Sequence, residues 1–184
     1  HAEINIRYEA PSSLRNYLFQ LMLNYEHSLK KIRKLVCYIT KAPLDPNNWG
    51  ENEFMQDEIS TIMESCPWNR IYDIIEYFYN KLPIYQKESF EKEINEYFEE
   101  KGIGWKLYNG NIEIRGDENF ENEIRKVEQI LEDNGLETSK SEIKEAIADL
   151  SRRPKAEITG SIQHSLAALE CLCREVTGDK KDTL

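Results

Sequence analysis

The chain has 184 residues, enough for one hydrophobic core or for two small subdomains that share one. Its 24 basic and 34 acidic side chains give a formal charge of −10, which argues against a surface wrapped in nucleic acid but leaves room for a local basic patch. No apolar run approaches the roughly 20 residues of a membrane span, and no signal-peptide pattern opens the chain, so we expect a cytoplasmic protein without a membrane partner. The four cysteines form no CxxC pair, which favours free thiols and predicts neither a metal nor a cofactor.

After an extended segment at residues 4–9, apolar residues at helical spacing predict five helices. The fourth, from Pro67 to Leu82, has the longest apolar face and is the expected centre of this half. Residues 42–52 predict a loop in which Trp49 either closes over the core or offers a platform for a ligand. The predicted buried faces are Leu14, Leu18, Leu21, Met22 and Tyr25; Leu29, Ile32, Val36 and Ile39; Met55, Ile59 and Ile62; Trp68, Ile71, Tyr72, Ile75, Phe78, Tyr79 and Leu82; and Phe90, Ile94, Tyr97 and Phe98.

The second predicted helix carries a cluster of basic residues opposite its apolar face. Its members are Lys30, Lys31, Arg33 and Lys34. In an acidic chain, such a cluster has two open interpretations: a solvated face balanced by acidic neighbours, or a contact with RNA or an acidic partner.

A change of period at about residues 104–115 predicts a β-hairpin. Asn109 and Gly110 form the two-residue turn that the right-handed twist of paired strands favours. Pairing about this turn places Trp105, Leu107, Ile112 and Ile114 on one face, which must lie on helices because an isolated hairpin is marginally stable. The chain is therefore predicted to be mainly α, a multi-helix bundle with one inserted two-stranded hairpin.

Two further helices follow the hairpin. Asp117 is the predicted N-cap of the first, and Asn134 and Gly135 end it. Ser139 and Glu142 fit a capping box that opens the second. The positions expected to point inward are Phe120, Ile124, Val127, Ile130 and Leu131 in the first helix, and Ile143, Ile147 and Leu150 in the second.

The terminal helix has an apolar face and a polar one. The apolar face contains Ile158, Ile162, Leu166, Leu169 and Cys173. Either the polar residues form the solvated side of an ordinary amphipathic helix, or they face a partner or RNA, because small residues such as Ala167 lie among them. The residues that would face a partner or RNA are Arg152, Arg153, Gln163, His164, Glu170 and Arg174. His164 is a weak catalytic candidate.

Short sequences along almost the whole chain resemble the AbiJ-type abortive-infection proteins of bacteria, in the group with the fourth class of AbiJ N-terminal domain. They are IRYEAP (6–11), DPNNW (45–49), Trp68, EIN (93–95), GIGW (102–105), RGD (115–117), DLSRRP (149–154), GSIQH (160–164), AALE (167–170), TGD (177–179) and the final Thr183 and Leu184. The resemblance implies an anti-phage protein in which a recognition or regulatory domain precedes a HEPN-like domain, a helical fold often associated with RNA cleavage.

HEPN nucleases typically carry Arg, four to six intervening residues and His, paired across a dimer for a metal-free attack by the ribose 2′-hydroxyl. Here ten residues separate Arg153 from His164, and eleven separate Arg15 from His27, so neither pair fits. The motif is expected downstream of Leu184. The resemblance thus predicts an AbiJ-like domain at residues 1–150 and the first helix of a HEPN-like domain at residues 151–184.

Three functions follow from these observations. The first is a non-catalytic sensing and interaction module that associates with itself, as a homodimer or otherwise, or with a partner. The expected contact is the Gln163–Arg174 face of the terminal helix. The second is a metal-independent RNA-cleaving enzyme of the HEPN type that uses His164 with Arg152 or Arg153. The third is an inert RNA-binding domain that uses the basic cluster of the second helix.

Overall fold

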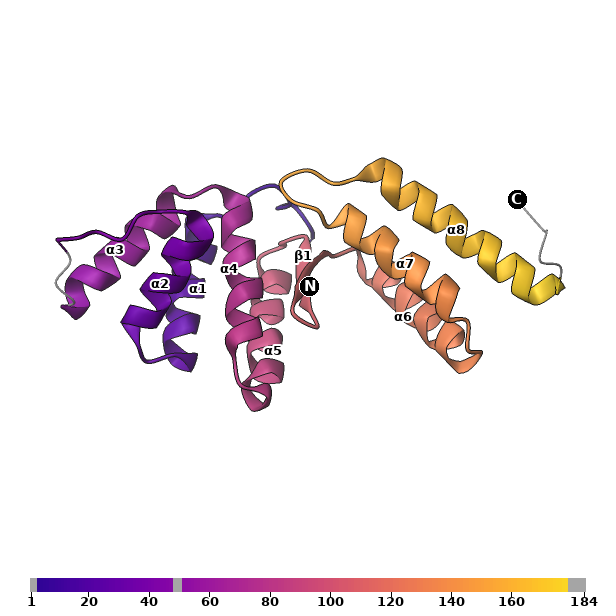
Figure 1. Ribbon diagram of the computed structural model, residues 1–184, viewed down its shortest axis with the longest axis horizontal. Helices are drawn as coiled ribbons and strands as arrows, with labels where there is room; N and C mark the ends of the chain where they lie inside the picture. Colours follow the sequence, from indigo (N-terminus) through magenta and orange to yellow (C-terminus); the bar gives the residue numbers. More distant parts are fainter. Residues whose placement is uncertain (1–2, 48–50, 179–184) are drawn as a thin grey trace. The chain divides into compact units, whose positions relative to one another are not determined.

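The computed structural model describes residues 3–47 and 51–178, so the predicted position of Trp49 lies outside the described residues. The described residues form eight α-helices and one two-stranded hairpin, which confirms the predicted fold class (Figure 1). The chain divides into two compact units, His1–Ile112 and Glu113–Leu184, here called unit 1 and unit 2. Over the ranges described, no helix is both long and apolar enough to cross a membrane.

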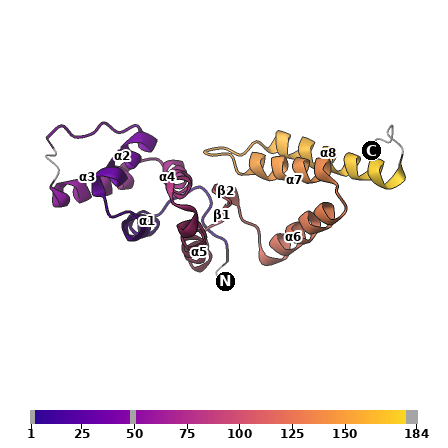
Figure 2. The same ribbon diagram turned by 60° about the horizontal axis from the view of Figure 1, so that its bottom comes forward.

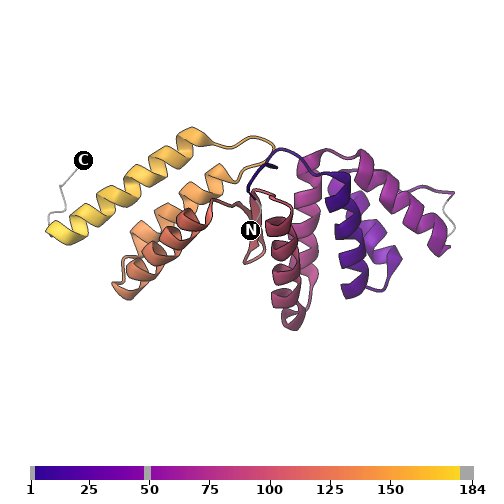
Figure 3. The same ribbon diagram turned by 180° about the vertical axis from the view of Figure 1, so that it is seen from behind.

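Unit 1 contains five helices. They are α1 Ser12–Tyr25, α2 Leu29–Thr40, α3 Asn52–Ser65, α4 Trp68–Lys81 and α5 Ile84–Glu100. Pro11, Pro67 and Pro83 each stand immediately before a helix, where a missing backbone N–H removes no helical hydrogen bond. The helices α4 and α5 lie side by side (Figures 1 and 3).

Helix α4 is the centre of unit 1, as its long apolar face predicts, and it contacts α1, α2 and α5. Helices α2 and α3 pack on each other, and α1 packs on α3. The largest buried side chains on these five helices include Leu14, Leu18, Met22, Ile32, Met55, Ile59, Tyr72 and Phe90. Burial of these apolar surfaces is the main force that holds unit 1 together.

The extended N-terminal segment pairs with the segment between α5 and the hairpin. Ile6 forms a parallel β-bridge with Ile103, and the N–H of Gly104 donates to the carbonyl of Ile6 at 2.7 Å. A Cβ at residue 104 would lie 2.9 Å from Cγ of Arg7, which explains why glycine stands there. The indole N–H of Trp105 then donates to the carbonyl of Arg7 at 2.6 Å.

Aromatic residues gather at the same junction. The ring centroid of Trp68 lies 5.9 Å from that of Tyr8, 5.9 Å from that of Tyr72 and 6.1 Å from that of Trp105. Such edge and offset contacts add to the stabilisation from apolar burial. The sequences IRYEAP, Trp68 and GIGW, which lie far apart along the chain, therefore build one structural contact.

The hairpin has the predicted position and turn. Its strands are β1 Trp105–Tyr108 and β2 Asn111–Ile114, drawn side by side in Figure 2. Asn109 and Gly110 both have positive φ, at 50° and 85°, as a type I′ turn requires. Asn95 of α5 holds β1: its side-chain amide donates to the carbonyl of Leu107 at 2.8 Å and accepts from the N–H of Leu107 at 2.7 Å.

Unit 2 is built on three helices. They are α6 Glu118–Asp133, α7 Glu137–Leu150 and α8 Ile158–Thr177. Asp117 caps α6 as predicted, because its carboxylate accepts from the N–H of Phe120 at 2.8 Å. Helix α7 contacts both others, and it lies beside α8 along most of its length (Figures 2 and 3). Ser151 at the end of α7 accepts a hydrogen bond from the N–H of Ile114 at 2.9 Å.

The predicted inward face of α6 is wrong in large part. Of its five apolar residues only Leu131 is buried, whereas Phe120, Val127 and Ile130 are exposed. Helix α7 is the element that packs on α6. Helix α7 alone covers only part of the width of the apolar face of α6, so the rest of that face stays exposed.

The predicted capping box of α7 is also wrong. Helix α7 begins at Glu137, two residues before Ser139, and no side chain caps it. The hydroxyl of Ser139 is buried without a hydrogen-bond partner among the described residues. Glu142 instead turns toward α8.

The domain boundary predicted between residues 150 and 151 does not coincide with the division into compact units. The structure divides the chain after Ile112, and α6, α7 and α8 belong to one unit. This division describes packing, so the predicted boundary between family domains stays a prediction.

Candidate functional site

The strongest polar cluster of unit 2 lies at the junction of α7 and α8, around His164. Nδ1 of His164 donates to a carboxylate oxygen of Glu142 at 2.7 Å, since a carboxylate only accepts. Nε2 of the same ring lies 3.8 Å from a carboxylate oxygen of Asp149. Both ring nitrogens therefore face acidic side chains of α7.

Asp149 holds the connection between the two helices. Its side chain is 5 % exposed and forms an ion pair with Arg152 at 2.8 Å. Its backbone carbonyl accepts from the N–H of Glu157, one residue before α8, at 2.8 Å. A Cβ at Gly160 would collide with the Asp149 carboxylate, so glycine lets the start of α8 approach this residue.

The charges of this cluster favour a cationic His164. The hydrogen bond to Glu142 is the largest of the effects that raise the pKa of His164 above its ordinary value of 6.5, and the charge of Asp149 raises it further. An imidazolium between two carboxylates is a stable interhelical contact. The two carboxylates would repel a phosphate at either ring nitrogen, so the cluster is better suited to joining α7 to α8 than to RNA cleavage.

The other polar residues predicted to face a partner are spread over unit 2. Arg153 is half-buried, precedes a cis peptide bond to Pro154, and donates to the carbonyl of Ser151 at 3.4 Å. Glu170 and Arg174 pair with each other at 3.3 Å, one turn apart on α8. Gln163 is exposed. His164 and Arg152 thus both lie close to Asp149. The structure does not bring the other predicted residues, Arg153, Gln163, Glu170 and Arg174, into this cluster.

Sequence reasoning missed Glu142 and Asp149 as members of the cluster. Glu142 fits a capping box by its spacing from Ser139, and this local pattern hid its tertiary role. The one available signal was the joint presence of Asp149 and Gly160 in the sequences DLSRRP and GSIQH, whose contact only the fold brings about.

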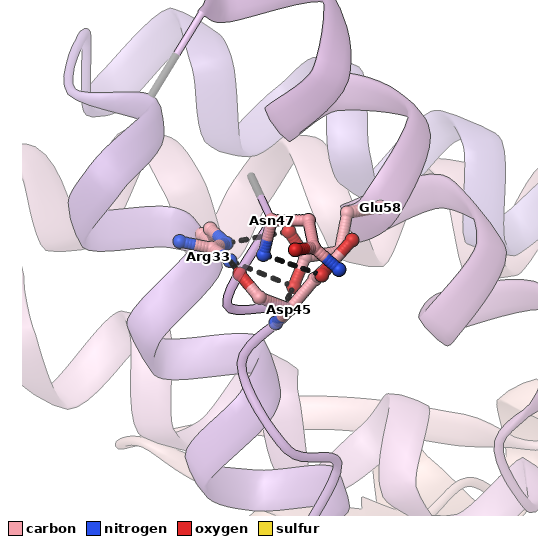
Figure 4. Close-up of polar contacts among 4 residues, drawn as sticks. All are labelled: Arg33, Asp45, Asn47 and Glu58. Atoms are coloured by element: carbon pink, nitrogen blue, oxygen red, sulfur yellow. Dashed lines mark hydrogen bonds and ion pairs between the residues drawn. The ribbon is translucent and has the colours of Figure 1, made fainter. Parts of the chain in front are cut away.

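The predicted basic cluster of α2 is divided between two sides of the helix. Arg33 points to α3 and forms a bidentate ion pair with Glu58, with distances of 2.7 and 3.0 Å (Figure 4). Both side chains are largely buried, at 14 % and 11 % exposed. Arg33 therefore joins α2 to α3 within unit 1 through its ion pair with Glu58.

This ion pair also holds the loop that contains the sequence DPNNW. Arg33 donates to the carbonyl of Asp45 at 2.9 Å, and Glu58 accepts from the N–H of Asp45 at 2.9 Å (Figure 4). The Asp45 carboxylate in turn accepts from the N–H of Asn47 at 2.8 Å, which forms an Asx turn. Asp45, at the start of the sequence DPNNW, is thus anchored by charge-assisted hydrogen bonds.

The three lysines of the cluster remain at the surface. Lys31 pairs with Glu26 at 2.9 Å and is 72 % exposed. Lys30 and Lys34 are exposed and form no ion pair with any residue in the described ranges. Lys31 and Lys34 line a groove of unit 1, whereas Arg33 lies on the α3 side.

Helix α8 presents the apolar face predicted from its sequence as an exposed stripe. Ile158, Ile162, Leu166 and Leu169 are 61, 56, 52 and 46 % exposed. The side against α7 is instead made of small residues, with Ser161 and Ala168 buried. Small residues let two helix backbones come close, which turns the larger apolar residues outward.

This helical domain with an inserted hairpin matches a known family. A sequence profile described as AbiJ N-terminal domain 4 matches residues 2–129, which is more than half of the chain. The chain therefore belongs to the AbiJ N-terminal domain 4 family, which places it among the abortive-infection defence proteins. The matched range includes all of unit 1 from residue 2 and most of α6. Searches of curated proteins and of solved structures give no match.

Proposed function

We propose that the chain is the sensing and interaction module of an abortive-infection protein and that it regulates a HEPN-like ribonuclease domain by self-association. The family membership supports the defence role. The apolar stripe of α8 is the single observation that carries the interaction role. Contiguous exposed apolar surface of this kind marks interaction sites in proteins.

The occupant that best fits this stripe is a second copy of the same chain. A groove of about 380 Å³ lies beside the stripe, lined by apolar residues of all three helices of unit 2, among them Phe120, Ile124, Val127 and Leu172. Each copy therefore offers an apolar ridge on α8 and an apolar groove next to it. The ridge itself, Ile158, Ile162, Leu166 and Leu169, carries no charge, so that two copies can meet about a twofold axis without charge repulsion.

Self-association would give this domain a way to control a nuclease. The active groups of HEPN nucleases are paired across a dimer, so an upstream domain that dimerises would bring two such domains together. The carboxylates around His164 support a non-catalytic role for these residues, because they disfavour phosphate binding. The lack of the HEPN spacing between Arg153 and His164 supports it as well.

Light scattering across a range of concentrations tests the interaction. We expect the wild-type chain to approach the mass of two chains and the double variant Ile162→Glu, Leu166→Glu to stay at the mass of one. Gln163→Glu is the matched control, because Gln163 is exposed next to the stripe and should leave the dimer intact. A wild-type mass of one chain at every concentration would overturn the proposal.

A ribonuclease assay with a chelator present tests the regulatory role. It compares these 184 residues with the full native reading frame that contains them. We expect no cleavage of total RNA by these residues alone. Cleavage by these residues that disappears on His164→Ala would contradict the proposal and favour the HEPN-type enzyme instead.

A further inference from the structure

Unit 1 contains a groove that neither the α8 stripe nor the His164 cluster uses. It has a volume of about 670 Å³ and lies between α2 and α4. The α1–α2 connection and the α4–α5 turn, which lie at the same end of unit 1 in Figures 1 and 3, close one end of it. Pockets of this size accommodate ligands of one or a few aromatic rings.

Exposed tyrosines are the first distinctive feature of this groove. Tyr38 is 58 % exposed and Tyr85 is 79 % exposed, although both line the groove. The ring of Tyr38 lies 5.5 Å from that of Tyr77, also in the lining. Aromatic rings that remain exposed in the folded protein are available for stacking with a ligand.

The second feature is positive charge. Lys31, Lys34 and Lys81 line the groove, and Glu26 is the one acidic residue among its lining. This excess is found in a chain with a net charge of −10. Lys34 forms no ion pair with any described residue, so its charge is available to a ligand.

Two tyrosines of this groove have a lysine ammonium over the ring. The Lys41 ammonium lies 4.5 Å from the centroid of the Tyr38 ring, and that of Lys81 lies 5.3 Å from the Tyr77 ring. Two of the tyrosines in the lining, Tyr38 and Tyr77, therefore each have a cation over the ring, Lys81 from within the lining and Lys41 from outside it. Proteins bind single-stranded nucleic acid with this combination, in which bases stack on aromatic rings and cations neutralise the phosphates.

We propose that the groove between α2 and α4 binds a short segment of single-stranded nucleic acid. Bases stack on Tyr38 and Tyr85, and the phosphates contact Lys31, Lys34 and Lys81. A duplex would keep its bases inside its own stack and leave the tyrosines unused. An acidic peptide would use the lysines but gain little from the exposed rings. The groove belongs to unit 1, so this inference does not depend on self-association through α8.

Fluorescence anisotropy with labelled single strands of about 10 nucleotides tests this inference. RNA and DNA strands of one sequence show which sugar the groove prefers, and binding of either supports the proposal. Tyr85→Ala should weaken binding by about tenfold. The double change Lys34→Gln, Lys81→Gln should weaken it further and make the salt dependence of the affinity shallower by about two phosphate contacts.

The matched control is Lys92→Gln, which removes a lysine that is 74 % exposed on α5 and outside the groove. It should leave the affinity unchanged. Tyr85 is so exposed that its loss should not unfold the chain, and an unchanged melting temperature checks this. The proposal is overturned if no single strand binds, if Tyr85→Ala binds as tightly as wild type, or if polyglutamate displaces the strand as well as unlabelled strand does.

Discussion

His164 of α8 donates a 2.7 Å hydrogen bond to Glu142 of α7, 22 residues earlier in the chain. The acceptor is charged and the contact raises the pKa of the imidazole. The folded protein thus binds this proton more tightly than the unfolded chain, whose histidine has an ordinary pKa of 6.5. Stability from the contact is present in full below pH 6.5 and is lost as the pH rises through the raised pKa.

We therefore predict that His164→Gln destabilises the α7–α8 contact at about pH 6 and has a much smaller effect at about pH 9. Amide hydrogen exchange of α8, corrected for the intrinsic rate at each pH, measures this. Every Trp and Tyr of the chain lies before residue 113, so optical probes of these residues would report on unit 1 instead.

Glu142→Gln should reproduce the effect of His164→Gln, because it removes the same charge-assisted hydrogen bond. Gln163→Ala, at the neighbouring exposed position, should change the protection of α8 little at either pH. Equal destabilisation by His164→Gln at both pH values would show that the charge of the imidazole is irrelevant to the contact.

Gly102 is expected to tolerate no side chain. Its φ is +65°, which costs an L-residue roughly 1–2 kcal/mol. A Cβ there would also collide with the backbone carbonyl of Glu3, which belongs to the extended N-terminal segment. Gly102→Ala should therefore destabilise unit 1 by more than about 2 kcal/mol in urea unfolding followed by tryptophan fluorescence. The exposed neighbour Lys101, with an ordinary φ, is the control: Lys101→Ala should stay within about 0.5 kcal/mol.

Arg15 of α1 is a buried clamp between three parts of unit 1. Its guanidinium donates to the carbonyls of Ala10 at 2.6 Å and Cys66 at 2.9 Å, and also to that of Met63. Arg15→Met would leave these buried carbonyls without their donor, and we expect a loss of about 3 kcal/mol in the same fluorescence assay. Lys92→Met, which removes an exposed cation, should have no measurable effect.

A transition of Arg15→Met that coincides with that of wild type would mean that these carbonyls find other donors. Such a result would show that Arg15 does not hold α1 against the α3–α4 connection.

Glu58 is expected to hold the loop before α3. Glu58→Gln weakens the bidentate ion pair with Arg33, and we predict a loss of about 2 kcal/mol. The loop should also become easier to cleave, since Glu58 accepts the N–H of Asp45. Limited proteolysis with mass spectrometry, which locates cuts at residues 42–47, measures this. Lys34→Gln, on the exposed side of α2, should leave the cleavage rate unchanged.

The local features of the fold were predictable from the sequence. The type I′ turn at Asn109 and Gly110, the N-cap at Asp117 and the central position of α4 each depend on residues that are neighbours along the chain. Steric preferences of the backbone and the period of the apolar residues act over such short distances. The family could also be identified from the sequence, because its short motifs are local and extend along unit 1.

The tertiary structure decided which of two physically reasonable partners each side chain takes. Glu142 had a local capping role available but binds His164, and Arg33 belongs to a lysine-rich face by sequence but pairs with Glu58. On α8 the helical period identifies an apolar face but does not say whether a neighbour covers it. Ser161 and Ala168 pack on α7 because close approach of the backbones is favourable there, and Leu166 is left in solvent. Periodicity fixes only which residues share a face, while burial depends on what the rest of the chain brings against that face.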